Sequence, residues 1–256
     1  RTRFCRPLTK PLIQGTITST QNNYFCFASA KKENNIGITK LFLSFLFFPP
    51  NIIEVEKMSL PLPIKYINNE KMTYTETVIP GVWIIEPKVL KDARGYFMEA
   101  FKQAEFEEHI GKIQFVQDNE SCSSKGVLRG LHYQLAPYSQ SKLVRVIKGR
   151  VLDVAVDVRE GSPTFGKYVA VELSDENKRQ LFIPQGFAHG FHVLSDEAIF
   201  TYKVDNPYTP THERGIRYDD PTVHVDWSIT DPESINLSEK DTKAPLLKDA
   251  ELNFKY

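Results

Sequence analysis

The chain lacks an excess of either charge, a cysteine framework and a hydrophobic run long enough to cross a membrane. Its 256 residues carry 32 basic and 32 acidic side chains, so the formal net charge is zero. A neutral chain gives no electrostatic reason to expect nucleic acid or an anionic membrane as a partner. The three cysteines (Cys5, Cys26 and Cys122) are scattered and odd in number. They predict neither a disulfide framework nor a metal cluster, and they favour a reducing, cytoplasmic location.

Residues 1–71 differ in composition from the rest of the chain. They contain only two glycines and no clear period, and residues 1–32 carry basic side chains but no acidic one. Such a composition resembles an organelle transit peptide. The apolar run 41–48 is shorter than the roughly 20 residues that span a bilayer. We interpret 1–71 as a leader, either disordered or translated from upstream sequence, with targeting as the alternative. We expect one domain over 72–256, starting at Met72.

From residue 72 onward, short segments rich in β-branched and aromatic residues alternate with turn signals such as Gly161-Ser-Pro163. Strands that follow one another without intervening helices indicate a sandwich or jelly roll. One helix is predicted at 102–110, and the tail 227–256 should form turns and short helices. The predicted strands are 82–86, 96–101, 142–147, 151–158, 168–173, 180–183 and 197–204.

The segment VLDVAVDV (151–158) shows the strand pattern most clearly. Leu152, Val154, Val156 and Val158 share one face, whereas the two aspartates and Ala155 share the other. This alternation predicts a strand with one buried face.

The stretch 126–142, GVLRGLHYQLAPYSQSK, holds the clearest chemical signal. His132 lies in an extended run, Lys142 opens the next one, and S-E-K-D at 238–241 supplies Lys240 and Asp241. A buried histidine needs a carboxylate to fix its tautomer and raise its basicity. A nearby ammonium can stabilise negative charge on an oxygen. Base, orienting carboxylate and cation together predict proton abstraction next to a carbonyl.

A series of motifs covers almost the whole of 72–256. They are DARGYFME (92–99), FVQDNES (115–121), KGVLRGLHYQ (125–134), SKLVRV (141–146), SPTFGK (162–167), IPQGFAHGF (183–191), TYKVDNPYTPTHERGIRYDDP (201–221) and SEKD (238–241). Their number and order make the segment closely similar to the dTDP-4-dehydrorhamnose 3,5-epimerase family. The resemblance implies a mainly β, cupin-type jelly roll (double-stranded β-helix) with a few short helices, usually as a homodimer. It implies no metal and no other cofactor.

The resemblance also implies a reaction and its residues. The family inverts C3 and C5 of dTDP-4-dehydro-6-deoxy-D-glucose to give dTDP-4-dehydro-L-rhamnose. His132 would remove protons next to the C4 ketone, Asp241 would be its carboxylate partner, Lys142 would stabilise the enolate oxygen, and Tyr202 would return a proton from the opposite face. Tyr208 would stack on the thymine. The remaining residues of the sugar-nucleotide site would be Arg94, Glu99, Gln117, Asn119, Arg129, His189, Glu213 and Lys240.

These roles agree with elementary chemistry. Inverting a carbon acid requires proton removal on one face and delivery on the other, so two groups are needed. A phenol, with an ordinary pKa near 10, is protonated at neutral pH and can serve as the acid. A lysine in a dry pocket can stabilise an enolate without a metal. Arg94 and Arg129 offer guanidinium forks for a diphosphate.

Two questions stay open at this level. Strict alternation puts Arg129 and His132 on opposite faces, so either Gly130 marks a bulge or Arg129 serves a neighbouring subunit's site. Pro184-Gln-Gly-Phe-Ala-His189 resembles a cupin metal motif, but His132-Tyr-Gln134 stands where a His-x-His pair would be needed, and His192 should point away from His189. The alternative functions are a C3- or C5-only epimerase of a related dTDP-4-keto sugar, a metal-dependent cupin enzyme and a non-catalytic sugar-binding jelly roll.

Overall fold

The structure, a computed structural model, describes residues 72–256. The predicted leader 1–71 lies outside the described residues. Within 72–256, no helix is both long and apolar enough to cross a membrane.

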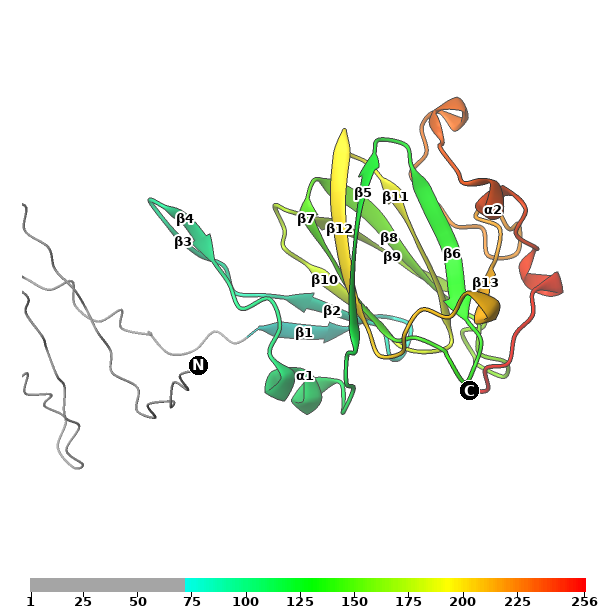
Figure 1. Ribbon diagram of the computed structural model, residues 1–256, viewed down its shortest axis with the longest axis horizontal. Helices are drawn as coiled ribbons and strands as arrows, with labels where there is room; N and C mark the ends of the chain where they lie inside the picture. The colour runs from blue at the N-terminus through cyan, green and yellow to red at the C-terminus, as the bar shows by residue number, and fades with distance from the viewer. Residues whose placement is uncertain (1–71) are drawn as a thin grey trace, which may run out of the picture. The chain divides into compact units, whose positions relative to one another are not determined.

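Short antiparallel strands are the main regular structure of the described chain (Figure 1). The strands are β1 (Thr73–Glu76), β2 (Trp83–Glu86), β3 (Leu90–Asp92), β4 (Gly95–Phe97), β5 (Gln117–Ser124), β6 (Leu128–Gln134), β7 (Lys142–Lys148), β8 (Arg150–Asp157), β9 (Tyr168–Ser174), β10 (Gln180–Ile183), β11 (Phe187–Val193), β12 (Glu197–Val204) and β13 (Glu213–Gly215). The helices are α1 (Gln103–His109), α2 (Glu239–Thr242), and the 3-10 helices η1 (Pro210–His212), η2 (Pro232–Ser234) and η3 (Leu247–Asp249).

The strands form a sandwich of two antiparallel sheets. The six-stranded sheet has the order β1-β2-β10-β7-β12-β5, and the five-stranded sheet has the order β13-β6-β11-β8-β9. The strands β3 and β4 pair only with each other, in a hairpin that extends away from the sandwich (Figure 1). The expected jelly roll is confirmed, as are the helix over 102–110 and the short helices of the tail.

The main core lies between the two sheets. Val144, Leu181 and Phe200 come from the six-stranded sheet and pack with Ala155 and Phe191 from the five-stranded sheet. All five side chains are almost fully buried. Because alternate residues of a strand face opposite sides, each of these strands presents a second set of side chains to the outside of the sandwich.

The outer face of β8 corrects one prediction. The strand was expected to bury a single face, but Asp153, Val154, Ala155, Val156 and Asp157 are all buried. Val154 and Val156 belong to a second apolar cluster, in which the tail contributes residues such as Trp227, Leu247 and Phe254. The tail therefore covers the face that would otherwise meet solvent, and the inward face carries a buried Asp153.

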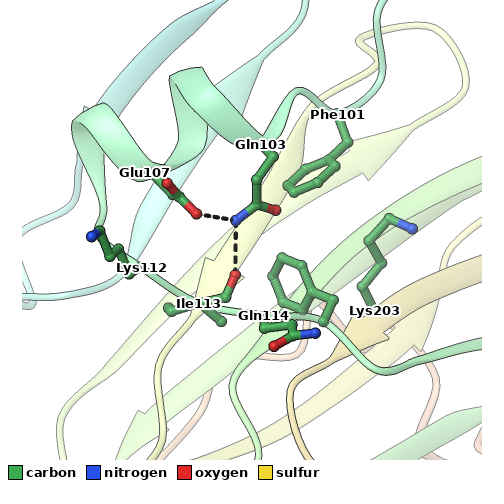
Figure 2. Close-up of a pocket in the computed structure, with 8 residues that line it drawn as sticks. Phe101, Gln103, Glu107, Lys112, Ile113, Gln114 and Lys203 are labelled. Carbon is green, nitrogen blue, oxygen red and sulfur yellow. Dashed lines mark hydrogen bonds between the residues drawn. The ribbon is translucent and has the colours of Figure 1, made fainter.

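The predicted strand 96–101 is also too long, since β4 ends at Phe97. Beyond it the chain turns toward α1, and the Phe101 ring packs 5.5 Å from Phe106 and 5.6 Å from Phe115, measured between ring centroids. Figure 2 shows the adjacent hollow, where Gln103 Nε2 donates to Glu107 Oε1 (2.6 Å) and to the Ile113 carbonyl (3.1 Å). These contacts tie α1 to the segment before β5, and no predicted site residue lines this hollow.

Candidate active site

A cavity of about 630 Å³ opens between the two sheets. Strands β5, β7 and β12 of the six-stranded sheet line one wall, and β6 and β11 of the five-stranded sheet line the other. This volume suits a small-molecule ligand. The predicted site residues that line it are Gln117, Asn119, Arg129, His132, Lys142, His189, Tyr202, Tyr208, Glu213, Lys240 and Asp241.

A bulge in β6 brings Arg129 and His132 to the same cavity. His132 pairs with His189 of β11, but Arg129 pairs with Phe191, so β6 advances by three residues while β11 advances by two. The extra residue lies beside Gly130, whose φ is +129°, and a Cβ there would lie 2.5 Å from the Gly190 Cα. Glycine is therefore required at the bulge. The bulge alternative is the one that the structure supports.

His132, which is half-buried, and the buried Asp241 form an acid–base pair. The His132 Nε2 lies 2.5 Å from Asp241 Oδ1, and the carboxylate side chain is only 4 % exposed. Since a carboxylate only accepts, Nε2 donates, and the neutral ring keeps a bare Nδ1. Burial raises the pKa of Asp241, but the hydrogen bond and charge of His132 outweigh burial and leave that pKa below its usual range. The carboxylate is thus held ionised beside the ring.

The short helix α2 fixes this carboxylate. Ser238 is its N-cap and accepts a hydrogen bond from the Asp241 backbone N–H at 3.2 Å. Serine followed three residues later by an acidic residue is a helix-start signal. The same S-E-K-D spacing that suggested a chemical role therefore also explains how Asp241 is positioned. Ser238 was not among the predicted site residues.

Lys142 begins β7 and presents its ammonium to the cavity. Burial lowers its pKa to about 8, although the charges of Asp153 and Glu213 oppose the shift. A lysine with this pKa is mostly protonated at neutral pH. It is also a better proton donor than an ordinary lysine, which suits a group that faces a developing oxyanion.

Tyr202 reaches the cavity from β12, on the sheet opposite His132. Burial raises the pKa of its hydroxyl, and the charge of Glu213 adds to the shift. The phenol is therefore protonated across the physiological range. Its ring lies 6.1 Å from that of Phe200, measured between centroids, on the same face of the strand.

Glu213 organises the rim of the cavity. Its Oε1 lies 2.5 Å from Lys240 Nζ, and its Oε2 accepts from the Tyr208 hydroxyl at 2.7 Å. Burial raises the pKa of Glu213, but these two hydrogen bonds outweigh it and leave the pKa lowered. The bond to Glu213 is the largest reason that the pKa of Tyr208 rises to about 12. Tyr208 keeps an exposed ring that can receive a flat base.

Polar side chains of β5 extend the site toward its mouth. Gln117 Nε2 donates to Asn119 Oδ1 at 2.7 Å, and the Tyr208 backbone N–H donates to Gln117 Oε1 at 3.2 Å. Arg129 Nε and Nη2 both donate to Ser123 Oγ, at 3.1 and 3.0 Å. One hydroxyl thereby holds the guanidinium across the two sheets and leaves other N–H groups free for an anion. Ser123 was not predicted, because a lone serine in a polar strand carries no signal.

His189 lies on the opposite side of the same strand from His192, as alternation predicts. His189 Nε2 donates to Asp153 Oδ2 at 2.9 Å, whereas His192 Nδ1 contacts the Trp227 carbonyl in the outer cluster at 2.9 Å. Burial lowers the pKa of His189 in spite of the adjacent Asp153 charge. Among residues 72–256 no group of three or more His, Cys, Asp or Glu side chains has the arrangement of a metal site.

Arg94 and Glu99 lie apart from the other predicted residues. Arg94 stands in the turn of the β3–β4 hairpin and pairs with Asp92 at 2.5 Å, with its side chain 86 % exposed. Glu99 follows the hairpin, with its side chain 62 % exposed and its Oε2 4.0 Å from Lys102 Nζ. Neither residue lines the cavity of its own chain.

Comparison with known proteins agrees with this geometry. The family model described as dTDP-4-dehydrorhamnose 3,5-epimerase matches residues 76–249. The chain belongs to the dTDP-4-dehydrorhamnose 3,5-epimerase family. The enzyme of this name from Shigella flexneri is 58 % identical over 181 residues, which cover 70 % of this chain and 98 % of that protein. The resemblance inferred from the motifs is confirmed, and with it the epimerase class.

Solved structures of epimerases share the fold. The dTDP-6-deoxy-D-glucose-3,5-epimerase of Legionella pneumophila, in complex with dTDP-4-keto-L-rhamnose, is 51 % identical with a TM-score of 0.70, and the match covers 72 % of this chain and 98 % of that one. A 3'-monoepimerase from Streptomyces bikiniensis, in complex with dTDP-quinovose, is 34 % identical with a TM-score of 0.63, and the match covers 67 % and 86 %.

Proposed function

We propose that this epimerase-family chain inverts C3 and C5 of dTDP-4-dehydro-6-deoxy-D-glucose to give dTDP-4-dehydro-L-rhamnose. The observation that carries the proposal is the pairing of His132, backed by Asp241, with Tyr202. The two groups line one cavity and come from opposing sheets. A carbon acid between them can lose a proton on one face and gain one on the other. The similarity to the Shigella and Legionella enzymes supports the same substrate class.

The first half of the reaction forms an enolate. The bare Nδ1 of His132 takes the proton from the carbon next to the C4 ketone, and the electrons of the broken C–H bond move onto the C4 oxygen. Asp241 stabilises the imidazolium that results, and Lys142 donates a hydrogen bond to the negative oxygen. General-base catalysis contributes about 10²- to 10⁴-fold in rate. An oriented cation in a pocket that excludes water contributes several kcal/mol more.

The second half inverts the centre. Tyr202 protonates the carbon from the opposite face while the enolate collapses back to the ketone. The phenolate then regains a proton from solvent, and the imidazolium of His132 returns its proton to solvent. No electrons leave the sugar, so the reaction is balanced without an oxidant. The same cycle at the second carbon completes the double inversion.

The substrate's nucleotide would occupy the mouth of the cavity. Arg129 would pair with the diphosphate, Tyr208 would stack on the thymine, and the remaining polar residues, Gln117, Asn119, His189, Glu213 and Lys240, would bind the sugar nucleotide. A homodimer would give roles to Arg94 and Glu99, because the projecting hairpin of one protomer could place them at the partner's cavity (Figure 1). The substrate class and the scattered cysteines support a cytoplasmic location.

The test is NMR of dTDP-4-keto-6-deoxyglucose incubated with the protein in D2O. We expect deuterium to enter at both C3 and C5, with formation of the L-sugar. Failure of exchange at either carbon contradicts the proposal. Exchange and inversion at C3 alone would favour the second candidate, a 3'-monoepimerase, which the similarity to the Streptomyces bikiniensis enzyme makes the nearest alternative.

A further inference from the structure

Asp153 is a buried carboxylate that the mechanism above does not use. It lies on β8, and its relative exposure is 0 %. Its Oδ2 accepts from His189 Nε2 at 2.9 Å. Its Oδ1 is the one buried side-chain nitrogen or oxygen without a hydrogen-bond partner within 72–256. Burying a carboxylate is costly unless it is paired, so an incompletely paired one calls for an explanation.

The explanation lies at Lys142, which lines the same cavity as His189, the histidine that Asp153 binds. Among the charges that act on the Lys142 ammonium, Asp153 is the strongest that favours the charged form. Glu213 also favours it, whereas Lys240 opposes it, and the charge of Lys142 acts in turn on His189, which binds Asp153. Both oxygens of the Glu213 carboxylate are bound, by Lys240 and Tyr208, whereas Asp153 Oδ1 has no hydrogen-bond partner among the described residues.

We propose that Asp153, tethered by His189, is a positioning residue that keeps Lys142 as the ammonium that faces the substrate's C4 oxygen. This inference rests on the role of Lys142 in the proposed function. The tether matters because a carboxylate free to rotate could pair fully with Lys142 and draw it away from the substrate. With Oδ2 bound to His189, Asp153 supplies a fixed negative charge, and the ammonium keeps its hydrogen-bond donors for the enolate.

The pH dependence of kcat should report the effect of Asp153 on Lys142. The folded pKa of Lys142, about 8, lies below its ordinary value of 10.5, so the ammonium is present below pH 8 and is lost as the pH rises through that value. The tyrosines in the cavity have raised pKa values, so their ionisation cannot cause a fall in kcat near pH 8. Removing an adjacent opposite charge lowers a lysine pKa by about one unit or more.

The direct test is Asp153→Asn, which keeps the shape and removes the charge. We expect the alkaline limb of kcat to move from about pH 8 to lower pH by about one unit or more. Asp157→Asn is the matched control, since Asp157 is equally buried on the same strand but binds Arg159, Ser162 and Thr164 away from the cavity. The control should leave the limb in place. An unmoved limb in active Asp153→Asn would overturn the inference.

A second measurement uses the wild-type protein and does not depend on the variant folding. With ¹³C at lysine Cε and aspartate Cγ, the Lys142 resonance, assigned by its loss in Lys142→Arg, should titrate near pH 8. The Asp153 carboxyl resonance should shift at the same pH. Independent behaviour of the two resonances contradicts the pairing. Because this titration needs no turnover, it separates failure of the Asp153 inference from failure of the proposed function, which would appear as absent deuterium exchange in the wild type.

Discussion

Replacing Asp241 by asparagine tests the acid–base pair at its most buried point. The substitution keeps the size of a side chain that is 4 % exposed and removes its charge. Hydrogen bonds to charged groups contribute about 1.5–3 kcal/mol. This interaction strengthens as His132 gains a proton, so most of its loss should fall on the transition state. At about 1.4 kcal/mol per factor of ten, kcat should fall about 10- to 150-fold.

The assay is the initial rate of deuterium entry at C3 and C5, followed by NMR under saturating substrate. Glu239→Gln is the control, because Glu239 lies on the same helix, is 82 % exposed and pairs with Lys243 outside the cavity lining. The control should retain the wild-type rate, and both variants should unfold at temperatures close to the wild type. A rate within twofold of wild type in folded Asp241→Asn, or an equal loss in the control, would refute the assigned role.

Four further predictions concern Tyr202, Lys142, the need for a metal, and residues 1–71. In Tyr202→Phe, exchange at a carbon should survive while inversion falls, and an equal loss of both would argue for binding or packing instead. Lys142→Ala and Lys142→Arg should both lower kcat, by about 10²-fold or more for alanine, because a planar fork cannot replace a compact ammonium at one oxygen. EDTA should leave the wild-type rate unchanged, and a chelator-sensitive rate restored by a divalent ion would contradict this. A chain beginning at Met72 should stay folded and fully active, and its insolubility would show that the leader belongs to the fold.

Periodicity alone predicted much of the sandwich because hydrophobic side chains facing a core repeat every second residue. The strands around Val144, Val171 and Phe200 follow that rule. β5 did not, since its sequence QDNESCSS contains no apolar run. Its inward positions line the cavity with Gln117, Asn119 and Ser121 instead of a core. A strand that lines a polar site therefore loses the signal by which strands are found.

The motifs predicted most residues of the candidate site, but they did not predict how these residues are arranged. The bulge at Gly130 depends on a close approach to Gly190, which is far from it in sequence. Asp153 lies on the inward face of β8 between the two sheets, while the tail buries the apolar outer face, so alternation alone made the face with Asp153 look exposed. Arg94 and Glu99 carry the family's motif but lie outside this chain's own cavity, which local sequence cannot reveal.

The architecture itself supplies the two-sided geometry that inversion needs. His132 belongs to β6 in the five-stranded sheet, and Tyr202 belongs to β12 in the six-stranded sheet, so no strand pairing connects them. Their separation is set by the thickness of the sandwich, which the packed core between the sheets fixes. Asp241 of α2 supports His132 by a hydrogen bond, and Glu213 of β13 holds Lys240 and Tyr208 at the rim. A base and an acid on one strand would face the same side of a substrate and would return each proton where it was taken. The sandwich avoids this by presenting the two groups from opposing walls of a single cavity.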